Sequence, residues 1–203
     1  MAEVSRYYVS DKDAGVSKGI LKNKLGFKSK KDLNEAETAL LSDTHAHFFE
    51  LLEKRKVKFD LSLLFSIHKY FLGHLYDWAG KVRTVNISKD EMFFAPIKYI
   101  NQVLADFNKL LKTTLPKQSD TQDKISKKLA IIHNEFNVIH PFREGNGRTI
   151  RLFLDLIAGS LGYNPIDWSK KPKSDYIAAC IKGAKGEHEL MAKIIKKGLK
   201  KST

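Results

Sequence analysis

The chain has 203 residues, of which 42% are hydrophobic and 29% charged, and its net charge is +13 at pH 7. This length suits one domain with a sizeable core, and no apolar stretch is long enough to cross a bilayer, which excludes a membrane-spanning protein. The single cysteine, Cys180, excludes internal disulfides and favours a reducing cytosol, while the positive charge favours anionic partners.

Apolar residues recur at three- and four-residue steps in most of the chain, which predicts amphipathic helices. The first predicted helix covers residues 32–56 with Ser29 as its cap, and the second follows the capping residue Asp60 as far as Leu72. Residues 82–96, VRTVNISKDEMFFAP, break this spacing, because β-branched and aromatic residues flank the polar turn SKDE. This stretch predicts a β-hairpin, and a lone hairpin needs packing from the helices.

Helical spacing returns after the hairpin and continues almost to the end of the chain. Pro96 suits the first turn of the next helix, and Gly162 suits the end of a later one. The lysine-rich stretch WSKKPKSD, residues 168–175, predicts a loop before two short closing helices. The predicted helices run over residues 96–111, 120–140, 146–162, 175–181 and 187–197.

Residues 140–151, HPFREGNGRTIR, interrupt this helical region with a proline and two glycines. The helix after them is predicted to start near Asn146 or Gly147, and a helix N-terminus offers unpaired N–H groups and a partial positive charge to an anion. Gly145 and Gly147 let the backbone turn sharply and approach a ligand closely. The stretch therefore predicts an anion-binding loop.

The charged side chains of this loop suit a polyphosphate and its chemistry. Arg148 and Arg151 lie three residues apart, so both guanidinium groups share one helix face near the anion. Glu144 precedes the turn, where its carboxylate is placed to hold Mg²⁺ against phosphates. His140 ends the preceding helix and is placed to take a proton from an attacking hydroxyl, whereas the other histidines are expected to be core or surface residues. Phe142 is predicted to anchor the loop in the core.

This constellation resembles the Fic (Fido) family, whose pattern is H-x-F-x-[D/E]-G-N-G-R-x-x-R. The similarity extends to residues 19–26 (GILKNKLG), to residues 60–88 and to the hairpin, and it covers about residues 7–195. We therefore expect a single domain over residues 1–203, with a basic, solvated tail at residues 196–203. Every fixed position of the pattern is matched, by His140, Phe142, Glu144, Gly145, Asn146, Gly147, Arg148 and Arg151.

The resemblance implies a mainly α fold, a Fic-type helical domain with one β-hairpin flap beside the active-site loop. It also implies the transfer of AMP from ATP to a Tyr, Thr or Ser hydroxyl of a target protein, with pyrophosphate leaving. In this scheme His140 is the general base, and Glu144 holds Mg²⁺ on the α- and β-phosphates. The implied nucleotide-binding residues are Gly145, Asn146 and Gly147 around the phosphates, Arg148 at the β-phosphate and Arg151 at the γ-phosphate.

The same resemblance assigns the docking of the target to the flap, residues 88–95, by strand-like pairing, and makes Phe94 a candidate clamp on the modified side chain. Relatives of the Doc type carry lysine where this chain has Gly147 and phosphorylate their targets, so Gly147 favours AMP transfer. The flap residues assigned to docking are Ser88, Lys89, Phe93, Phe94 and Ala95.

Two other functions stay open from the sequence. One is a Fic-fold enzyme that transfers another nucleotide or phosphate-containing group, and the other is a nucleotide-binding module without transfer activity. His140 argues against the module, because a pure binder needs no base beside the phosphates. The C-terminal stretch KIIKKGLKKST lacks an aromatic or arginine-rich recognition pattern, so nucleic acid is not expected as a direct substrate, and neither is a membrane partner.

Many Fic proteins carry an inhibitory helix of pattern [S/T]-x-x-x-[E/D]-[G/N], whose acidic residue pairs with the second arginine of the motif. No such pattern is found here, since Ser119 precedes Asp123 by four residues but Lys124 follows. We therefore expect Arg151 to lack an internal acidic partner and a separate antitoxin protein to supply one. The N-terminus has no apolar signal region, so we expect a cytoplasmic protein or an effector secreted into a host cell.

Overall fold

The computed structural model describes residues 8–9, 16–17, 20–89 and 92–202 of the chain. Within them the fold is mainly helical, which confirms the predicted fold class. Two short 3₁₀ helices, η1 (Ile97–Tyr99) and η2 (Trp168–Lys170), accompany the α-helices. The α-helices are α1 (Lys30–Glu53), α2 (Leu61–Leu72), α3 (Ile100–Thr114), α4 (Gln122–Ile139), α5 (Asn146–Ser160), α6 (Lys173–Gly183) and α7 (Glu189–Gly198).

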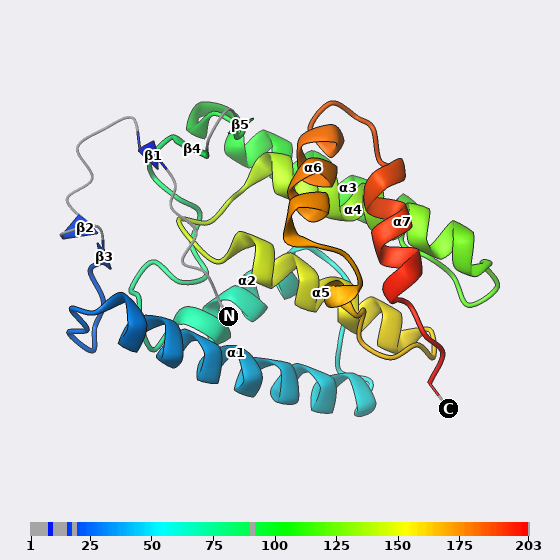
Figure 1. The fold of residues 1–203 in the computed structure, drawn as a ribbon, viewed down its shortest axis with the longest axis horizontal. Helices are drawn as coiled ribbons and strands as arrows, with labels where there is room; N and C mark the ends of the chain where they lie inside the picture. The colour runs from blue at the N-terminus through cyan, green and yellow to red at the C-terminus, as the bar shows by residue number, and fades with distance from the viewer. Residues whose placement is uncertain (1–7, 10–15, 18–19, 90–91, 203) are drawn as a thin grey trace.

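Helix α4 lies at the centre of the fold, where it packs against α3, α5, α6 and α7 (Figure 1). Helix α5 packs between α4 and the long helix α1, and α2 packs against both α1 and α5. The main core lies among these helices and includes the fully buried Leu129, Phe136 and Phe153. A second cluster around Leu33 and Phe71 joins α1 to α2. The turn from α4 to α5 therefore lies against α1 and α2.

The predicted helix starts agree with the structure where a capping side chain is present. The Ser29 hydroxyl accepts hydrogen bonds from the first N–H groups of α1, at 3.2 Å from the nitrogen of Lys31. The Asp60 carboxylate accepts one from the N–H of Leu63 at 3.2 Å and begins α2. Pro96 behaves differently, because it precedes the 3₁₀ helix η1, and α3 begins only at Ile100.

The predicted hairpin is present as β4 (Ile87–Lys89) and β5 (Met92–Phe93), with Ser88 paired to Phe93. It is not a lone hairpin. Strand β1 (Tyr8–Val9) pairs antiparallel with β4, so the sheet has the order β1-β4-β5. A second pair, β2 (Val16–Ser17) and β3 (Ile20–Leu21), precedes α1. Two-residue strands are too short to show an alternating pattern, which explains why the sequence did not predict them.

One prediction near the C-terminus was wrong, and another holds in part. The stretch predicted as a loop, residues 168–175, holds η2 and the first turn of α6. In the predicted solvated tail the lysines of residues 196–202 are exposed, but the stretch also ends α7 and contains the buried Leu199. Beyond it the chain bonds back to the segment after α5, where the N–H of Ser202 donates to the carbonyl oxygen of Gly162 at 3.0 Å. No helix in the described part of the chain is long and apolar enough to span a membrane.

Candidate active site

His140 directly follows α4 in a left-handed conformation, with φ of 49° and ψ of 62°. Its side chain is buried, and ring atom Nδ1 lies 2.8 Å from the carbonyl oxygen of Asn137. Because a carbonyl only accepts, Nδ1 carries the proton and the lone pair of the neutral ring lies on Nε2. Burial lowers the pKa of His140 to about 3, and the charges of Arg83 and Lys89 add to this effect. The ring is therefore neutral at physiological pH, as a general base must be.

The flap contacts His140 directly. The ring of Phe94 stacks on the imidazole with 3.7 Å between the ring centroids, and Phe94 is only 7% exposed. The next residue, Ala95, donates its N–H to the carbonyl oxygen of Val138 at 3.0 Å, which ties the flap to α4. Phe93 is 84% exposed, so the two neighbouring phenylalanines have opposite environments.

Arg83 joins the flap to the end of α4, a role that was not predicted from residue types or spacing. Its side chain is buried, and Nε donates to the carbonyl oxygen of His140 at 2.8 Å. Nη1 donates to the carbonyl oxygen of Val85 at 2.7 Å, and Nη2 donates to that of Ala95. One planar side chain thereby fixes the backbone before and after the hairpin and the backbone of His140. Burial lowers the pKa of Arg83 to about 10, so it remains charged.

The motif loop is closed by the Asn146 side chain. Its Oδ1 accepts from the N–H of Phe142 at 2.9 Å, and its Nδ2 donates to the carbonyl oxygen of Phe142 at 2.8 Å. Phe142 is fully buried, as predicted, and stacks on the ring of His68 with 3.7 Å between centroids. The Asn146 side chain, which was expected to contact phosphates, thus bonds to the backbone of its own loop.

His68 in α2 holds the other side of the loop. Its Nδ1 accepts from the N–H of Gly80 at 2.8 Å, which leaves the proton on Nε2 for the carbonyl oxygen of Glu144, 2.9 Å away. Burial lowers the pKa of His68 to about 4, so this ring is also neutral. The histidines other than His140 were expected to be core or surface residues, and His68 is a core residue, but its contact with the motif was not foreseen.

Only one of the two motif glycines is required by the backbone. Gly145 has φ of +81° at the start of α5, and a Cβ there would lie 2.8 Å from Cδ1 of Leu72. Gly147 lies in the first turn of α5, and a Cβ there would meet no atom closer than 3.7 Å, at Nη1 of Arg151. The predicted sharp turn is therefore made by Gly145, while Gly147 keeps space beside the arginine.

Glu144 is buried at the turn, where its Oε1 accepts from the N–H of Gly145 at 2.9 Å. Burial raises its pKa to about 7. The described residues contain no group of three or more His, Cys, Asp or Glu side chains that could hold a metal ion. A single carboxylate nevertheless fits Mg²⁺, because this ion is commonly bound by one or two carboxylates together with substrate phosphates and water.

The two motif arginines have different partners. Arg148 donates through Nη1 to Oε2 of Glu37 in α1 at 2.5 Å, a contact that the sequence did not predict. Arg151 donates through Nη1 to the hydroxyl of Tyr176 in α6 at 3.4 Å, and its guanidinium lies over that ring. Within the part of the chain that the structure describes, Arg151 forms no ion pair comparable to that of Arg148 with Glu37.

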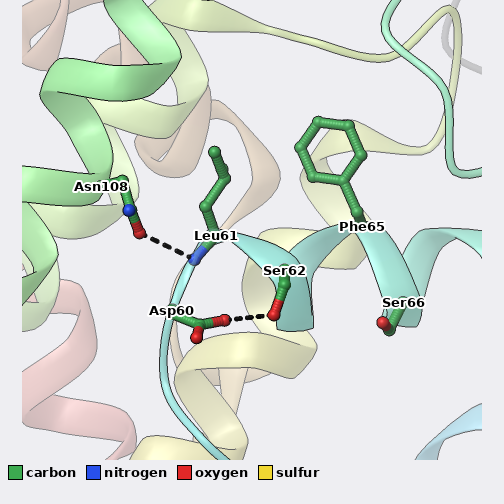
Figure 2. A pocket seen from close by; sticks show the side chains of 6 residues that line it. All are labelled: Asp60, Leu61, Ser62, Phe65, Ser66 and Asn108. Carbon is green, nitrogen blue, oxygen red and sulfur yellow. Dashed lines mark hydrogen bonds between the residues drawn. The ribbon is translucent and has the colours of Figure 1, made fainter.

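A hollow on the surface lies beside the start of α2, apart from the predicted site residues (Figure 2). One of its lining residues, Phe65, meets the ring of Phe142 edge to face with 5.0 Å between centroids. Another, Asn108, accepts a hydrogen bond from the N–H of Leu61 at 3.2 Å, which joins α3 to α2 (Figure 2). The hollow therefore adjoins the packing behind the loop and not its charged face.

Comparison with known proteins agrees with this arrangement. A model of the Fic/DOC family matches residues 58–158 of the chain. The protein adenylyltransferase VbhT of Bartonella schoenbuchensis is 33% identical over 186 residues, which cover 91% of this chain and 38% of VbhT. The probable protein adenylyltransferase y4lH of Sinorhizobium fredii is 28% identical over 83% of this chain and 85% of its own length. The chain thus spans well under half of VbhT but most of y4lH.

The fold is also similar to that of solved structures. The BepC protein of Bartonella tribocorum, a VirB-translocated effector with bound AMPPNP, has a TM-score of 0.75 and 23% identity, covering 93% of this chain and 97% of that one. The N-terminal Fic domain of a putative cell filamentation protein of Bartonella quintana has a TM-score of 0.73 and 24% identity. At this identity the likeness extends to the fold alone.

Proposed function

The chain belongs to the Fic/DOC family, and we propose that it is a protein adenylyltransferase, which transfers AMP from ATP to a hydroxyl side chain of a target protein. One observation carries the proposal. A buried, neutral histidine with its lone pair on Nε2 begins the short loop that leads to the N-terminus of α5, a helix with two arginines in its first turns. This arrangement supports a base acting near an anion site, which is what phosphoryl chemistry on a hydroxyl needs.

In the proposed reaction the target hydroxyl oxygen attacks the α-phosphorus of ATP. The bond between the α-phosphorus and the oxygen that bridges it to the β-phosphate breaks, and pyrophosphate leaves with that oxygen. The hydroxyl proton passes to Nε2 of His140. Because Nδ1 of His140 stays bonded to the carbonyl oxygen of Asn137, the ring keeps its orientation while it accepts the proton.

The triphosphate binds at the start of α5 in this scheme. The N–H groups of its first turn and the positive end of the helix face the phosphates, and Gly145 lets the backbone approach them. Arg148 and Arg151 supply charge for the β- and γ-phosphates. The Asn146 side chain acts one step back, by holding the loop closed through the backbone of Phe142.

Glu144 would hold Mg²⁺ together with phosphate oxygens and water. When bound, this ion neutralises negative charge on the departing pyrophosphate. The protein contributes the position of the carboxylate, which the N–H of Gly145 fixes at the turn. The remaining ligand positions are filled from outside the chain, in keeping with the single carboxylate at the loop.

Target docking is proposed at the flap. In the described residues β1 covers the outer edge of β4, whereas β5 ends the sheet, so a target segment would pair with β5. The exposed ring of Phe93 on β5 offers an apolar contact to that segment, and Phe94 lies against His140, next to the hydroxyl that is modified.

The experiment that tests the proposed function follows a radioactive α-phosphate from ATP into protein. The purified chain should label target proteins in a lysate. The rate of labelling should be higher with ATP than with other nucleotides. His140→Ala should reduce the rate by about 10²–10⁴-fold while ATP still binds, whereas the exposed His74→Ala should label as the wild type does. Labelling by His140→Ala at the wild-type rate, or label transferred only from the γ-phosphate, would refute AMP transfer with this base.

Regulation by a separate antitoxin protein is part of the proposal, because Arg151 bonds to Tyr176 and forms no ion pair with a carboxylate among the described residues. The chain purified alone should label itself with Mg-ATP. If it is inert until one of its own acidic residues is replaced, an internal inhibitor exists and this part of the proposal is wrong.

The proposed location of the protein is the cytoplasm or, since the similar BepC is a translocated effector, a host cell. Fractionation of infected or expressing cells decides between the two.

A further inference from the structure

Glu37 is the acidic residue that pairs with the first arginine of the motif, and it comes from the distant helix α1. Its carboxylate is 1% exposed, and the side chain of Arg148 is 10% exposed. Oε2 accepts from Nη1 of Arg148 at 2.5 Å, and Oε1 accepts from the hydroxyl of Tyr76 at 2.9 Å. Both carboxylate oxygens are therefore used, one for the arginine and one for a second anchor.

The guanidinium of Arg148 is held at its face and at Nη1, but Nη2 has no hydrogen bond among the described residues. The guanidinium lies over the ring of Phe71 at 4.9 Å, and Nη1 is bonded to Glu37. Nη2 is buried and forms no hydrogen bond among the described residues, and its only ion pair there is a long one, 3.6 Å to Oε1 of Glu144 at the turn. A buried charged donor without a hydrogen bond is costly, so its position suits a ligand oxygen that completes the bonding.

We propose that Glu37 is a positioning residue for Arg148, which fixes the guanidinium so that Nη1 faces α1 and Nη2 faces the phosphate-binding loop. This inference rests on the proposed function and adds to it a residue outside the motif. Arginine is a long side chain whose ordering costs conformational entropy. An ion pair formed before the nucleotide arrives removes that cost from the reaction and presents the donor in one orientation.

The geometry distinguishes positioning from inhibition. An inhibitory carboxylate must leave the arginine when the enzyme becomes active, but Glu37 is buried within a helix and is also bonded to Tyr76. Burial, and then the charge of Glu37, raise the pKa of Tyr76, so its hydroxyl stays a donor to that carboxylate. The pair occupies only one of the two terminal nitrogens of Arg148, so it leaves the other for the ligand.

The test compares Glu37→Gln with Glu35→Gln, the same change at an exposed position on the same helix. We expect Glu37→Gln to lower kcat/KM for ATP in α-phosphate transfer by about 10²-fold, and Glu35→Gln to leave it unchanged. Tyr76→Phe should lie between them, because it loosens Glu37 without removing its charge. Melting temperatures of all variants show which are folded, and Glu37→Asp, which keeps the charge but shortens the side chain, replaces Glu37→Gln if that variant does not fold.

A double-mutant cycle separates positioning from a merely structural role. If Glu37 acts only through Arg148, the pair Glu37→Gln with Arg148→Gln should transfer AMP at the rate of Arg148→Gln alone, within about twofold. Independent, multiplying losses would overturn the inference, and so would transfer by Glu37→Gln at or above the wild-type rate.

Calorimetric binding of Mg-ATP distinguishes this inference from the proposed function. If the wild type binds Mg-ATP but transfers no AMP, the proposed function fails, whereas weaker binding by Glu37→Gln and unchanged binding by Glu35→Gln would still support positioning. If the wild type transfers AMP and Glu37→Gln behaves like it in both assays, the positioning role fails and the proposed function stands. A wild type that neither binds nor transfers overturns both.

Discussion

The ring of Phe94 lies parallel to the imidazole of His140, with 3.7 Å between the centroids and 18° between the planes. Besides its proposed role in target docking, the flap is therefore in direct contact with the ring of the proposed base. Phe94 directly follows β5 and His140 directly follows α4, so this stacking joins the hairpin to the start of the motif loop.

Replacing the two neighbouring phenylalanines separates their roles. Phe94→Ala should destabilise the fold by about 3 kcal/mol and lower the transfer rate by about 10²-fold, because the buried ring packs on the base. Phe93→Ala should change stability by less than about 0.5 kcal/mol, because its ring is exposed, and should raise KM for the target protein. Urea unfolding and transfer kinetics measure both. Equal effects of the two variants would contradict the assignment.

Arg83 is expected to support stability and activity together. Arg83→Met leaves the carbonyl oxygens of His140, Val85 and Ala95 without their donor, which should cost at least about 2 kcal/mol of unfolding free energy and slow AMP transfer. Lys81→Met removes the same charge from an exposed position two residues earlier and should do neither. Urea denaturation and the transfer assay decide, and an Arg83→Met protein as stable and active as Lys81→Met would disprove the anchor role.

The Glu144 carboxylate should matter for activity but not for folding. Burial raises its pKa to about 7, so its surroundings favour the neutral acid, which glutamine imitates. Glu144→Gln should therefore melt at or slightly above the wild-type temperature and lose AMP transfer. EDTA should abolish wild-type transfer, and added Mg²⁺ should restore it. Full activity in excess EDTA, or in Glu144→Gln, would remove the metal from the mechanism.

The two buried histidines at the loop should have opposite tautomers. His140 carries its proton on Nδ1, and His68 carries it on Nε2, because the backbone partners of the two rings differ in kind. Burial lowers their pKa values to about 3 and about 4, so neither ring should titrate between about pH 5 and pH 8. Long-range ¹H–¹⁵N NMR of the imidazole nitrogens measures tautomer and titration together. Titration of His140 near its ordinary pKa would show that its ring is exposed to water.

The sequence predicted what depends on neighbouring residues. The caps Ser29 and Asp60 and the helix start at Asn146 follow from local residue types and spacing, and the structure has them. The contacts that hold the site were not predictable in this way. Glu37 and Arg148 are 111 residues apart, and Arg83 and His140 are 57 apart. A charge that is buried by the tertiary fold looks the same in a sequence as one in solvent.

The packing of the C-terminal stretch was also difficult to predict from the sequence. Its lysines indicated a solvated tail, but the apolar Leu199 and backbone bonding to the residues after α5 fix it to the fold. Lysine stems cover apolar surface while their charges stay in water, so composition alone does not distinguish a docked segment from a loose one. The 3₁₀ turn at Trp168 escaped prediction for a similar reason, because it depends on the tertiary contact of its indole N–H with Asp155.

The docking of residues 200–202 against residues 162–164 also determines where an attached label or fused domain would emerge. Helix α5 has 15 residues and is therefore about 22 Å long, with the proposed phosphate-binding loop at its start and this junction just beyond its end. Figure 1 shows the red segment after α7 at that far end of α5. A fluorescent reporter or an affinity handle joined after residue 202 would therefore be attached far from the proposed nucleotide site and would leave that site accessible.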